Sequence, residues 1–337
     1  MLAESTKIGI HAVDVSETDL RQKYPEVLKI LLRDHTTRQN IFWGTDDYKE
    51  LGPGYGYHDQ IFPALITGER GMVIMPRVKK AKTLQCSRIK DMAEVFTPSW
   101  VCNAQNNLVD SAWFGRENVF NTEMTEGNQH SWLTTSAKIE FPAGKTWKNY
   151  VSENRMEITC GEAPYITSRY DTTTGEFIPV EQRIGLLDRK LRVVNENVDH
   201  STEWLKWVQT AYKSIYAYEW QGDSLLLARE AMLYTFLENY LLKFGKMPQD
   251  KSIRYIAYII SWNVWQMDGL KFVVPDSCHE AECNQPLLGF MEEKKQPCPG
   301  CAKKDFNKHN GIYCLIKDWK EKKTIKFVDL LNEGSKK

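Results

Sequence analysis

The residues best suited to bind a metal are four cysteines near the C-terminal end. They form two pairs, Cys278-x4-Cys283 and Cys298-Pro-Gly-Cys301, separated by fourteen residues. Two closely spaced thiolate pairs can complete a tetrahedral zinc site, and four thiolates leave no coordination position open for a substrate. The pattern therefore predicts a structural zinc rather than a catalytic one. The alternatives for one of the four ligands are His279, His309 and Cys314.

A second stretch with chemical potential is residues 156–166, with the sequence MEITCGEAPYI. An acid, Glu157, follows an apolar strand-like run, and a turn with small residues comes next. In a parallel α/β sheet, ligands bind beyond the carboxyl ends of the strands. Small residues at such a turn let the backbone approach a ligand closely. The stretch is either part of a ligand site or a plain structural turn.

This stretch resembles the cofactor motif of N6-adenine DNA methyltransferases, especially their type I modification-subunit branch. The family motif reads Leu-Asp-Pro-Ala-Cys-Gly-Ser-Gly-x-Phe-Leu. Cys160 and Gly161 match it outright, Glu157 takes the place of the acid, and Ala163 replaces the second glycine. The resemblance implies that these four residues contact S-adenosylmethionine.

A second signature of the same family lies upstream, in the order that the family has. Residues 93–98, AEVFTP, look like the family's Gly-x-Phe-Tyr-Thr-Pro. In that family this segment touches the methionine part of S-adenosylmethionine. By resemblance, Phe96, Thr97 and Pro98 are therefore expected in the cofactor site.

Two further acids resemble cofactor contacts of the family more loosely. Asp188 ends the run RIGLLD (183–188), which looks like the family's second strand, where an acid accepts hydrogen bonds from the ribose hydroxyls. Asp223, in the sequence WQGDSL, resembles the acid that reads the adenine amino group. For both acids the alternative is a helix cap.

The family's catalytic tetrapeptide, Asn or Asp followed by Pro-Pro and an aromatic residue, has no match in the chain. The best positional candidate is the segment SWNVWQ (261–266), which follows an apolar run that suits a buried strand over 253–262. An extruded adenine needs an acceptor for its amino group and a ring to stack on. Asn263 is the candidate acceptor, and Trp262 or Trp265 is the candidate ring. The alternative is that both tryptophans belong to the core.

Periodicity predicts the elements that would position these residues. Apolar residues at helical spacing predict helices over 17–33, 99–114, 201–219 and 224–244. Short strand-like runs are 155–161 and 183–188, and 121–149 reads as an irregular connection. Strands that alternate with helices favour an open α/β sheet.

Composition limits the class of protein. The 337 residues carry 44 Lys+Arg and 44 Asp+Glu, so the chain is no simple basic nucleic-acid coat protein, although a local basic patch remains compatible with DNA binding. Two such stretches, 69–90 and the lysine-rich segment 294–326, are either solvated surfaces or phosphate contacts. The sequence has no apolar run long enough for a membrane helix and no evident secretory signal, which predicts a cytoplasmic protein without a membrane partner.

Together these features predict an α/β protein with a Rossmann-like, doubly wound sheet of the S-adenosylmethionine-dependent methyltransferase type. We expect a helical or irregular N-terminal extension (1–90, a candidate DNA contact), a methyltransferase domain (91–275) and a zinc-binding basic element (276–337). The implied activity is methyl transfer to adenine N6 in DNA, as in restriction-modification or phage DNA modification, with DNA and a restriction or specificity subunit as partners. Two alternatives stay open, a catalytically inactive nucleic-acid-binding relative and a methyltransferase acting on RNA or protein.

Overall fold

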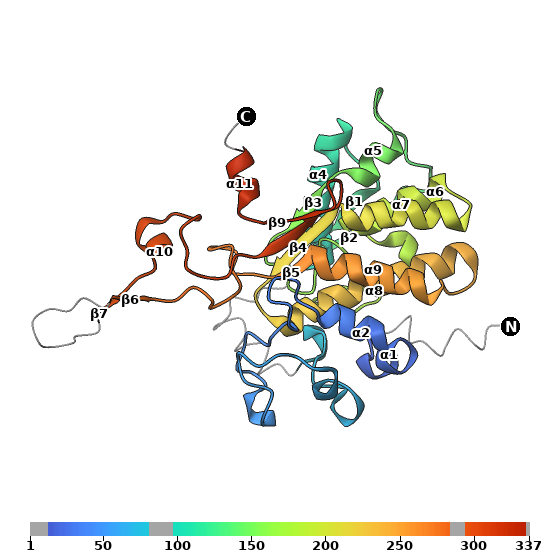
Figure 1. Ribbon diagram of the computed structural model, residues 1–337. Coiled ribbons are helices and arrows are strands. Elements are labelled where there is room, and N and C mark those ends of the chain that lie inside the picture. The colour runs from blue at the N-terminus through green and yellow to red at the C-terminus, as the bar shows by residue number, and fades with distance from the viewer. Residues whose placement is uncertain (1–12, 81–96, 284–293, 335–337) are drawn as a thin grey trace, which may run out of the picture.

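A small parallel sheet lies at the centre of the computed structural model (Figure 1). The structure describes residues 13–80, 97–283 and 294–334. The sheet consists of β3 (Arg155–Glu157), β4 (Ile215–Glu219) and β5 (Val264–Gln266) in the order β3-β4-β5, and both pairs are parallel. The protein is thus a mixed α/β fold, as the strand–helix alternation predicts.

The two faces of the sheet bury different cores because successive strand residues point to opposite sides. Ile215 and Ala217 of β4 belong to the large core that the helices form. Tyr218, on the other face, packs with Trp265 and Ile316 in a second, smaller core. Helices therefore cover one face, and part of the C-terminal region covers the other.

Six helices between residues 99 and 263 contribute side chains to the large core. The longest, α8, is buried along most of its length, and its Arg229 guanidinium donates to the Val264 backbone carbonyl of β5. The six helices are α4 (Ser99–Phe114), α5 (Trp147–Ser152), α6 (Leu186–Asn197), α7 (Ser201–Lys213), α8 (Gly222–Phe244) and α9 (Asp250–Asn263).

The N-terminal region packs onto this body and crosses the carboxyl ends of the strands. Its helices are α1 (Glu17–Lys23) and α2 (Pro25–Leu32), separated where Pro25 starts a new helix. Residues 40–44, which we call the crossing segment, then run over the sheet edge. Phe42 exchanges two backbone hydrogen bonds with the Gln266 side chain, and the Gly222 N–H donates to the Trp43 carbonyl.

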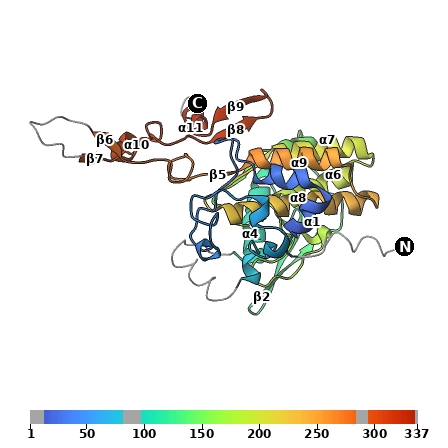
Figure 2. The ribbon, with the colours of Figure 1, turned by 60° about the horizontal axis from the view of Figure 1, so that its bottom comes forward.

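Short turns and hairpins make up the rest of the described chain. The 3-10 turns are η2 (Lys49–Leu51), η3 (Pro63–Leu65), η4 (Gly68–Arg70), η5 (Arg77–Lys79) and η6 (Val180–Gln182). The antiparallel pairs are β1 (Asn121–Glu126) with β2 (Gln129–Thr134), β6 (Ala281–Cys283) with β7 (Lys294–Gln296), and β8 (Leu315–Asp318) with β9 (Lys323–Lys326). The last two helices are α10 (Pro299–Lys303) and α11 (Asp329–Gly334). Figures 1 and 2 show β6, β7 and α10 extending away from the body, whereas β8 and β9 lie against it.

Several sequence-based predictions of elements are confirmed, and four are wrong. The helix over 99–114 and most of that over 224–244 are present. The run 253–262 is part of helix α9, not a strand; 183–188 leads into helix α6; 201–219 is helix α7 followed by strand β4; and 121–149 contains the β1–β2 hairpin. The predicted doubly wound sheet is found only as a three-stranded parallel sheet among the described residues.

Two buried carboxyl groups lie between α1 and α8, and they should make the stability of the protein depend on pH. Glu17 is 1% exposed and Glu230 is fully buried, and none of their carboxyl oxygens has a hydrogen-bond partner among the described residues. Burial raises the pKa of Glu17 to about 9 and that of Glu230 well above its ordinary value. A carboxyl whose pKa rises on folding contributes full stability below its unfolded pKa and loses it as the pH rises through the folded pKa.

Replacing Glu230 by glutamine should therefore stabilise the protein at pH 8 by on the order of 2 kcal/mol, because the amide needs no proton to stay neutral. The gain should shrink at pH 5, where the carboxyl of the unfolded chain is itself partly protonated. Urea denaturation at the two pH values measures this. Glu238→Gln is the matched control on the same helix; Glu238 is ion-paired with Arg169 and Arg183, so its substitution should destabilise. A Glu230→Gln protein less stable than the parent at pH 8 would refute the assignment.

Candidate functional site

The turn that follows β3 has an unusual backbone. Thr159, Gly161 and Ala163 have φ angles of 47°, 53° and 60°, in the left-handed region that favours glycine. A Cβ built on Gly161 would meet no atom of the described residues within 4 Å, so these residues leave open space beside it. The turn predicted from small residues is therefore present and has room next to it.

Glu219, the last residue of β4, holds this turn from the neighbouring strand. One carboxylate oxygen accepts a hydrogen bond from the Gly161 N–H at 2.8 Å. The other accepts from the Trp220 and Gln221 N–H groups at 2.8 and 3.2 Å. Burial raises the pKa of Glu219, although these three backbone donors counteract the shift. Periodicity alone does not single out Glu219, because it assigns residues 201–219 to one helix.

Glu157, the last residue of β3, is a buried acid with an unused oxygen. It is 8% exposed, its Oε2 has no hydrogen-bond partner among the described residues, and its Oε1 receives a long 3.5 Å bond from the Tyr165 N–H. Burial raises its pKa well above the ordinary value for glutamate. A buried polar atom without a partner costs free energy, so this oxygen is suited to a ligand donor.

The start of α4 lies next to the same turn. The Asn106 side chain of α4 donates to the Tyr165 carbonyl at 3.0 Å, and Glu157 is close enough to raise the pKa of the Cys102 thiol. The Thr97 carbonyl accepts from the Thr172 hydroxyl at 3.0 Å. Two segments far apart in sequence thus meet beside the β3 turn. Pro98 is the N-cap residue of α4, and Phe96 lies outside the described residues.

Cys160 and Ala163 form the buried floor of the turn. Cys160 is 3% exposed and its N–H donates to the Tyr218 carbonyl at 2.9 Å, while burial raises the pKa of its thiol well above the ordinary value. Ala163 is fully buried, and its carbonyl accepts from the Ile166 and Thr167 N–H groups. These residues shape the turn through their small size and their backbone.

The two looser acid candidates both serve helix starts. Asp188 stands at the third position of α6, where it accepts hydrogen bonds from Gly185 and from the Ser168 N–H and hydroxyl. Asp223 lies in the first turn of α8, fully buried, and accepts from the Tyr48 hydroxyl at 2.7 Å and from Lys80 at 3.1 Å. The capping alternative fits Asp188, and a buried ion pair accounts for Asp223.

The candidate catalytic segment lies in the core. Asn263 is fully buried; its Nδ2 donates to the Tyr212 and Ile215 carbonyls, and its Oδ1 accepts from the Trp319 indole at 2.8 Å. Trp265 is 2% exposed. With its polar atoms engaged and its side chain enclosed, Asn263 is not placed to accept from an adenine amino group. The placement of Asn263 and Trp265 therefore does not agree with the predicted acceptor and ring. Trp262, the other candidate ring, is partly exposed and stacks on His35.

Four metal-ligating side chains converge in the C-terminal region: Cys278, Cys298, Cys301 and His309. Their ligand atoms all lie within 4.8 Å of one another. Cys278 Sγ is 3.3 Å from Cys298 Sγ and 3.8 Å from Cys301 Sγ, and His309 Nδ1 is 3.4–3.7 Å from the three sulfurs. Tetrahedral zinc–thiolate geometry places neighbouring ligand atoms about 3.8 Å apart. The four residues therefore fit one zinc ion.

Local structure explains why these four residues meet. Cys298 caps α10, and its Sγ accepts from the Cys301 N–H at 3.3 Å, as in a zinc knuckle. A Cβ on Gly300 would lie 2.6 Å from the His309 backbone nitrogen, so only glycine permits this approach. Three of the four predicted ligands are present in the cluster. His309, one of the three alternatives, takes the fourth position, and the side chain of Cys283 lies outside the described residues.

Comparison with known proteins identifies no relative, because no family model, curated protein or solved structure matches the chain. In the part of the chain that the structure describes, no helix combines the length and the apolar character needed to cross a membrane.

Proposed function

We propose that the chain binds S-adenosylmethionine at the carboxyl edge of β3 and β4. The observation that carries this proposal is the meeting of Thr97 with the turn at 157–165. Both segments resemble the cofactor contacts of one family, and nothing in their separation along the chain requires them to touch. The α4 segment that begins after Thr97 also bonds the turn, through Asn106 and the Tyr165 carbonyl, and this proximity supports a common ligand.

Glu157 offers this ligand a buried oxygen that no described residue engages. Burial raises the pKa of Glu157 in the empty site, whereas the positive sulfonium and amino group of S-adenosylmethionine would lower it and favour the carboxylate. The open space beside Gly161 leaves room for the ligand to approach the backbone. Each strand of the sheet has an acid at or just after its carboxyl end, Glu157, Glu219 and Asp268, where ligands of parallel α/β sheets bind.

The reaction that we propose is methyl transfer to the N6 of adenine in DNA. The sulfonium loses its charge as the methyl group leaves, so the enzyme mainly has to position the acceptor in line with the methyl. The family resemblance supports adenine as the acceptor. In this proposal the sheet is one half of a methyltransferase-type Rossmann fold, and specificity comes from the N-terminal region, the Cys3His element or a separate subunit.

A second candidate function is nucleic-acid binding without methyl transfer. The burial of Asn263 and Trp265 favours it, because the best sequence match to a catalytic amide and ring is engaged in the core. The described sheet also has three strands, whereas a complete doubly wound fold is built from two such halves.

Calorimetric titration with S-adenosylhomocysteine and transfer of labelled methyl groups to DNA, RNA or protein test these functions. We expect micromolar binding of S-adenosylhomocysteine. Methyl transfer to adenine would support the enzyme, and binding without transfer to any acceptor would support the second candidate. The absence of S-adenosylhomocysteine binding would contradict the cofactor site.

The variant Asn263→Ala tests whether Asn263 has a structural or a catalytic role. Because its amide joins three core elements, we expect a loss of about 2 kcal/mol in unfolding free energy and an unchanged affinity for S-adenosylhomocysteine. Ser224→Ala, another buried polar change next to the sheet, is the control for general destabilisation. Loss of transfer without loss of stability in Asn263→Ala would instead assign a catalytic role.

A further inference from the structure

A hollow lies between α2 and α9, away from the turn at Gly161, and its lining has an unusual composition. It has a volume of about 470 Å³ and is lined by Lys29, Ile30, Arg33, His35, Asn40, Phe62, Pro63 and Tyr258. Three of these side chains are aromatic rings, two are cations, and none of them is an acid. Rings next to cations are the combination that single-stranded nucleic acids bind, since bases stack on the rings and phosphates pair with the cations.

The rings are held in place before any ligand binds. His35 stacks on Trp262 with ring centroids 3.9 Å apart and an interplanar angle of 8°, and its Nε2 lies 2.9 Å from the Ser261 hydroxyl. The Tyr258 hydroxyl accepts a 2.7 Å hydrogen bond from Lys317, whose ammonium group also lies over the Tyr258 ring. Ordered rings lose little freedom on binding, which favours affinity. Phe62 is different, because it is 49% exposed and stands at the opening.

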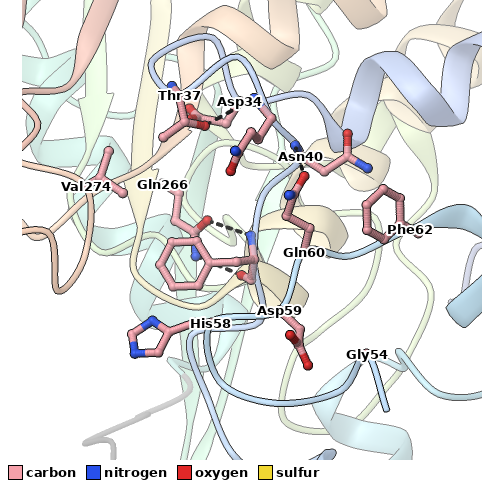
Figure 3. Close-up of a pocket in the computed structure, with 12 residues that line it drawn as sticks. Asp34, Thr37, Asn40, Gly54, His58, Asp59, Gln60, Phe62, Gln266 and Val274 are labelled. Carbon is pink, nitrogen blue, oxygen red and sulfur yellow. Dashed lines mark hydrogen bonds between the residues drawn. The ribbon is translucent and has the colours of Figure 1, made fainter.

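This hollow leads towards the sheet through two shared residues. Asn40 and Phe62 also line the pocket of about 270 Å³ drawn in Figure 3, which reaches Gln266 at the end of β5. Two acids line this second pocket, and both are already hydrogen-bonded: Asp34 accepts from the Thr37 N–H and hydroxyl, and Asp59 accepts from the Gly56 N–H. There the Gln60 Oε1 accepts from the Asn40 N–H, and the Asn40 Nδ2 donates to the Ile61 carbonyl. Within the described residues, the Asn40 Oδ1 acceptor and the Gln60 Nε2 donor have no hydrogen-bond partner. Side-chain amides with both kinds of atom can pair with the edge of a base.

We propose that these two hollows form one channel that holds a single-stranded nucleic acid. A base stacks between Phe62 and His35, whose ring is perpendicular to that of Tyr258, and its phosphate lies at Arg33 and Lys29. The next base points along Asn40 and Gln60 towards the end of β5. The inference rests on the proposed function in its choice of a nucleic-acid partner, and it adds the surface that holds the strand.

The charge of the rim favours a strand over an apolar peptide. Arg33 is exposed on the chain that leaves α2, and Lys29 lies one turn before it. Lys29 forms a solvent-exposed ion pair with Glu26, which a phosphate can replace at little cost. An apolar peptide would have to cover both cations, whereas a phosphate pairs with them.

Fluorescence anisotropy with a labelled single-stranded DNA of about 12 nucleotides tests the channel. Phe62→Ala and Arg33→Gln should each weaken binding at least tenfold, and Arg33→Gln should also reduce the dependence of binding on salt. The matched controls are Leu242→Ala, a 53% exposed apolar side chain of α8, and Lys206→Gln, an exposed cation of α7. Both controls should stay within twofold of the parent. Thermal melting checks that all four variants fold.

Titration with adenosine monophosphate distinguishes a strand from a single nucleotide as the occupant. Adenosine monophosphate should bind at least a hundredfold more weakly than the single-stranded DNA. Equal affinities would contradict the proposal of a strand-binding channel and indicate a mononucleotide site. Unchanged DNA binding in both Phe62→Ala and Arg33→Gln would overturn the channel. The affinity for S-adenosylhomocysteine should be the same in all four variants, so a failure of the cofactor proposal in the parent protein is seen separately from a failure of the channel.

Discussion

Replacing Gly161 by valine should reduce the affinity for S-adenosylhomocysteine at least a hundredfold while the protein stays folded. Gly161 has a φ of 53°, and a Cβ built there would meet no atom of the described residues within 4 Å, so a side chain fits beside them but fills the space that we assign to the ligand. Its N–H must also keep its bond to Glu219. Calorimetric titration measures the affinity, and circular dichroism checks the fold.

Gly245→Val is the matched control for backbone strain. Gly245 ends α8 with a φ of 64°, and a Cβ there would also meet no atom within 4 Å. Forcing a β-branched residue into this region costs about 1–2 kcal/mol at either position. Both variants should therefore lose similar stability, and only Gly161→Val should lose the ligand. Normal binding by Gly161→Val would show that the turn does not contact the cofactor.

The sequence predicts best those helices that have one apolar face or a clear start. The helix over 99–114 follows Pro98, which fits a helix start, and it is found as α4. The run IRYIAYIISW in α9 suggests a strand instead, because it is apolar on nearly every side. The helix packs against α2, α7 and α8, so several of its faces need apolar residues. Short apolar runs cannot distinguish a buried helix from a buried strand.

The candidate site is predictable only in part, for a related reason. Motif resemblance selects the turn around Gly161, but it does not reveal Glu219, which bonds that turn from β4. The signal is present in IYAYE, where the alternation of small or aliphatic with aromatic residues suits a strand with two buried faces and ends in an acid. Asn263 is a candidate only because it follows the strand expected over 253–262. The structure has a helix there, α9, and Asn263 is its last residue, so it does not lie at the carboxyl end of a strand.

The second face of the sheet connects the strands of the proposed cofactor site with the Cys3His cluster. Tyr218 and Trp265 pack against Ile316 of β8 and Phe327 after β9, and Cys314 joins the same core. The chain reaches this hairpin only after passing through Cys278, Cys298, Cys301 and His309. A metal at these residues therefore fixes the segment that precedes the β8–β9 hairpin, which packs on the second face of the sheet. The connection therefore indicates which part of the chain should lose its order when the metal is removed.

The purified protein should hold about one zinc ion per chain, and His309→Ala or Cys298→Ser should abolish this binding. Structural zinc contributes apparent binding free energies of about 10–16 kcal/mol in small zinc domains, so residues 278–309 should lose their order without it. The body should remain folded, because β8 and β9 retain their apolar contacts with β4 and β5. Elemental analysis measures the metal. Limited proteolysis should show new cleavage between residues 278 and 309, and no cleavage in α8.

Two other cysteines provide the controls for the ligand set. Cys314→Ala removes a buried thiol that lies outside the cluster and bonds the Gln266 carbonyl, so it should keep the zinc and lose only stability. Cys283→Ala should also keep the zinc, because His309 already provides the fourth ligand. Zinc lost from Cys283→Ala but retained by His309→Ala would restore the set of four cysteines that the spacing alone predicts. The variants at Cys283 and His309 therefore decide which residue is the fourth zinc ligand: Cys283, which the sequence spacing predicts, or His309, which the structure places in the cluster.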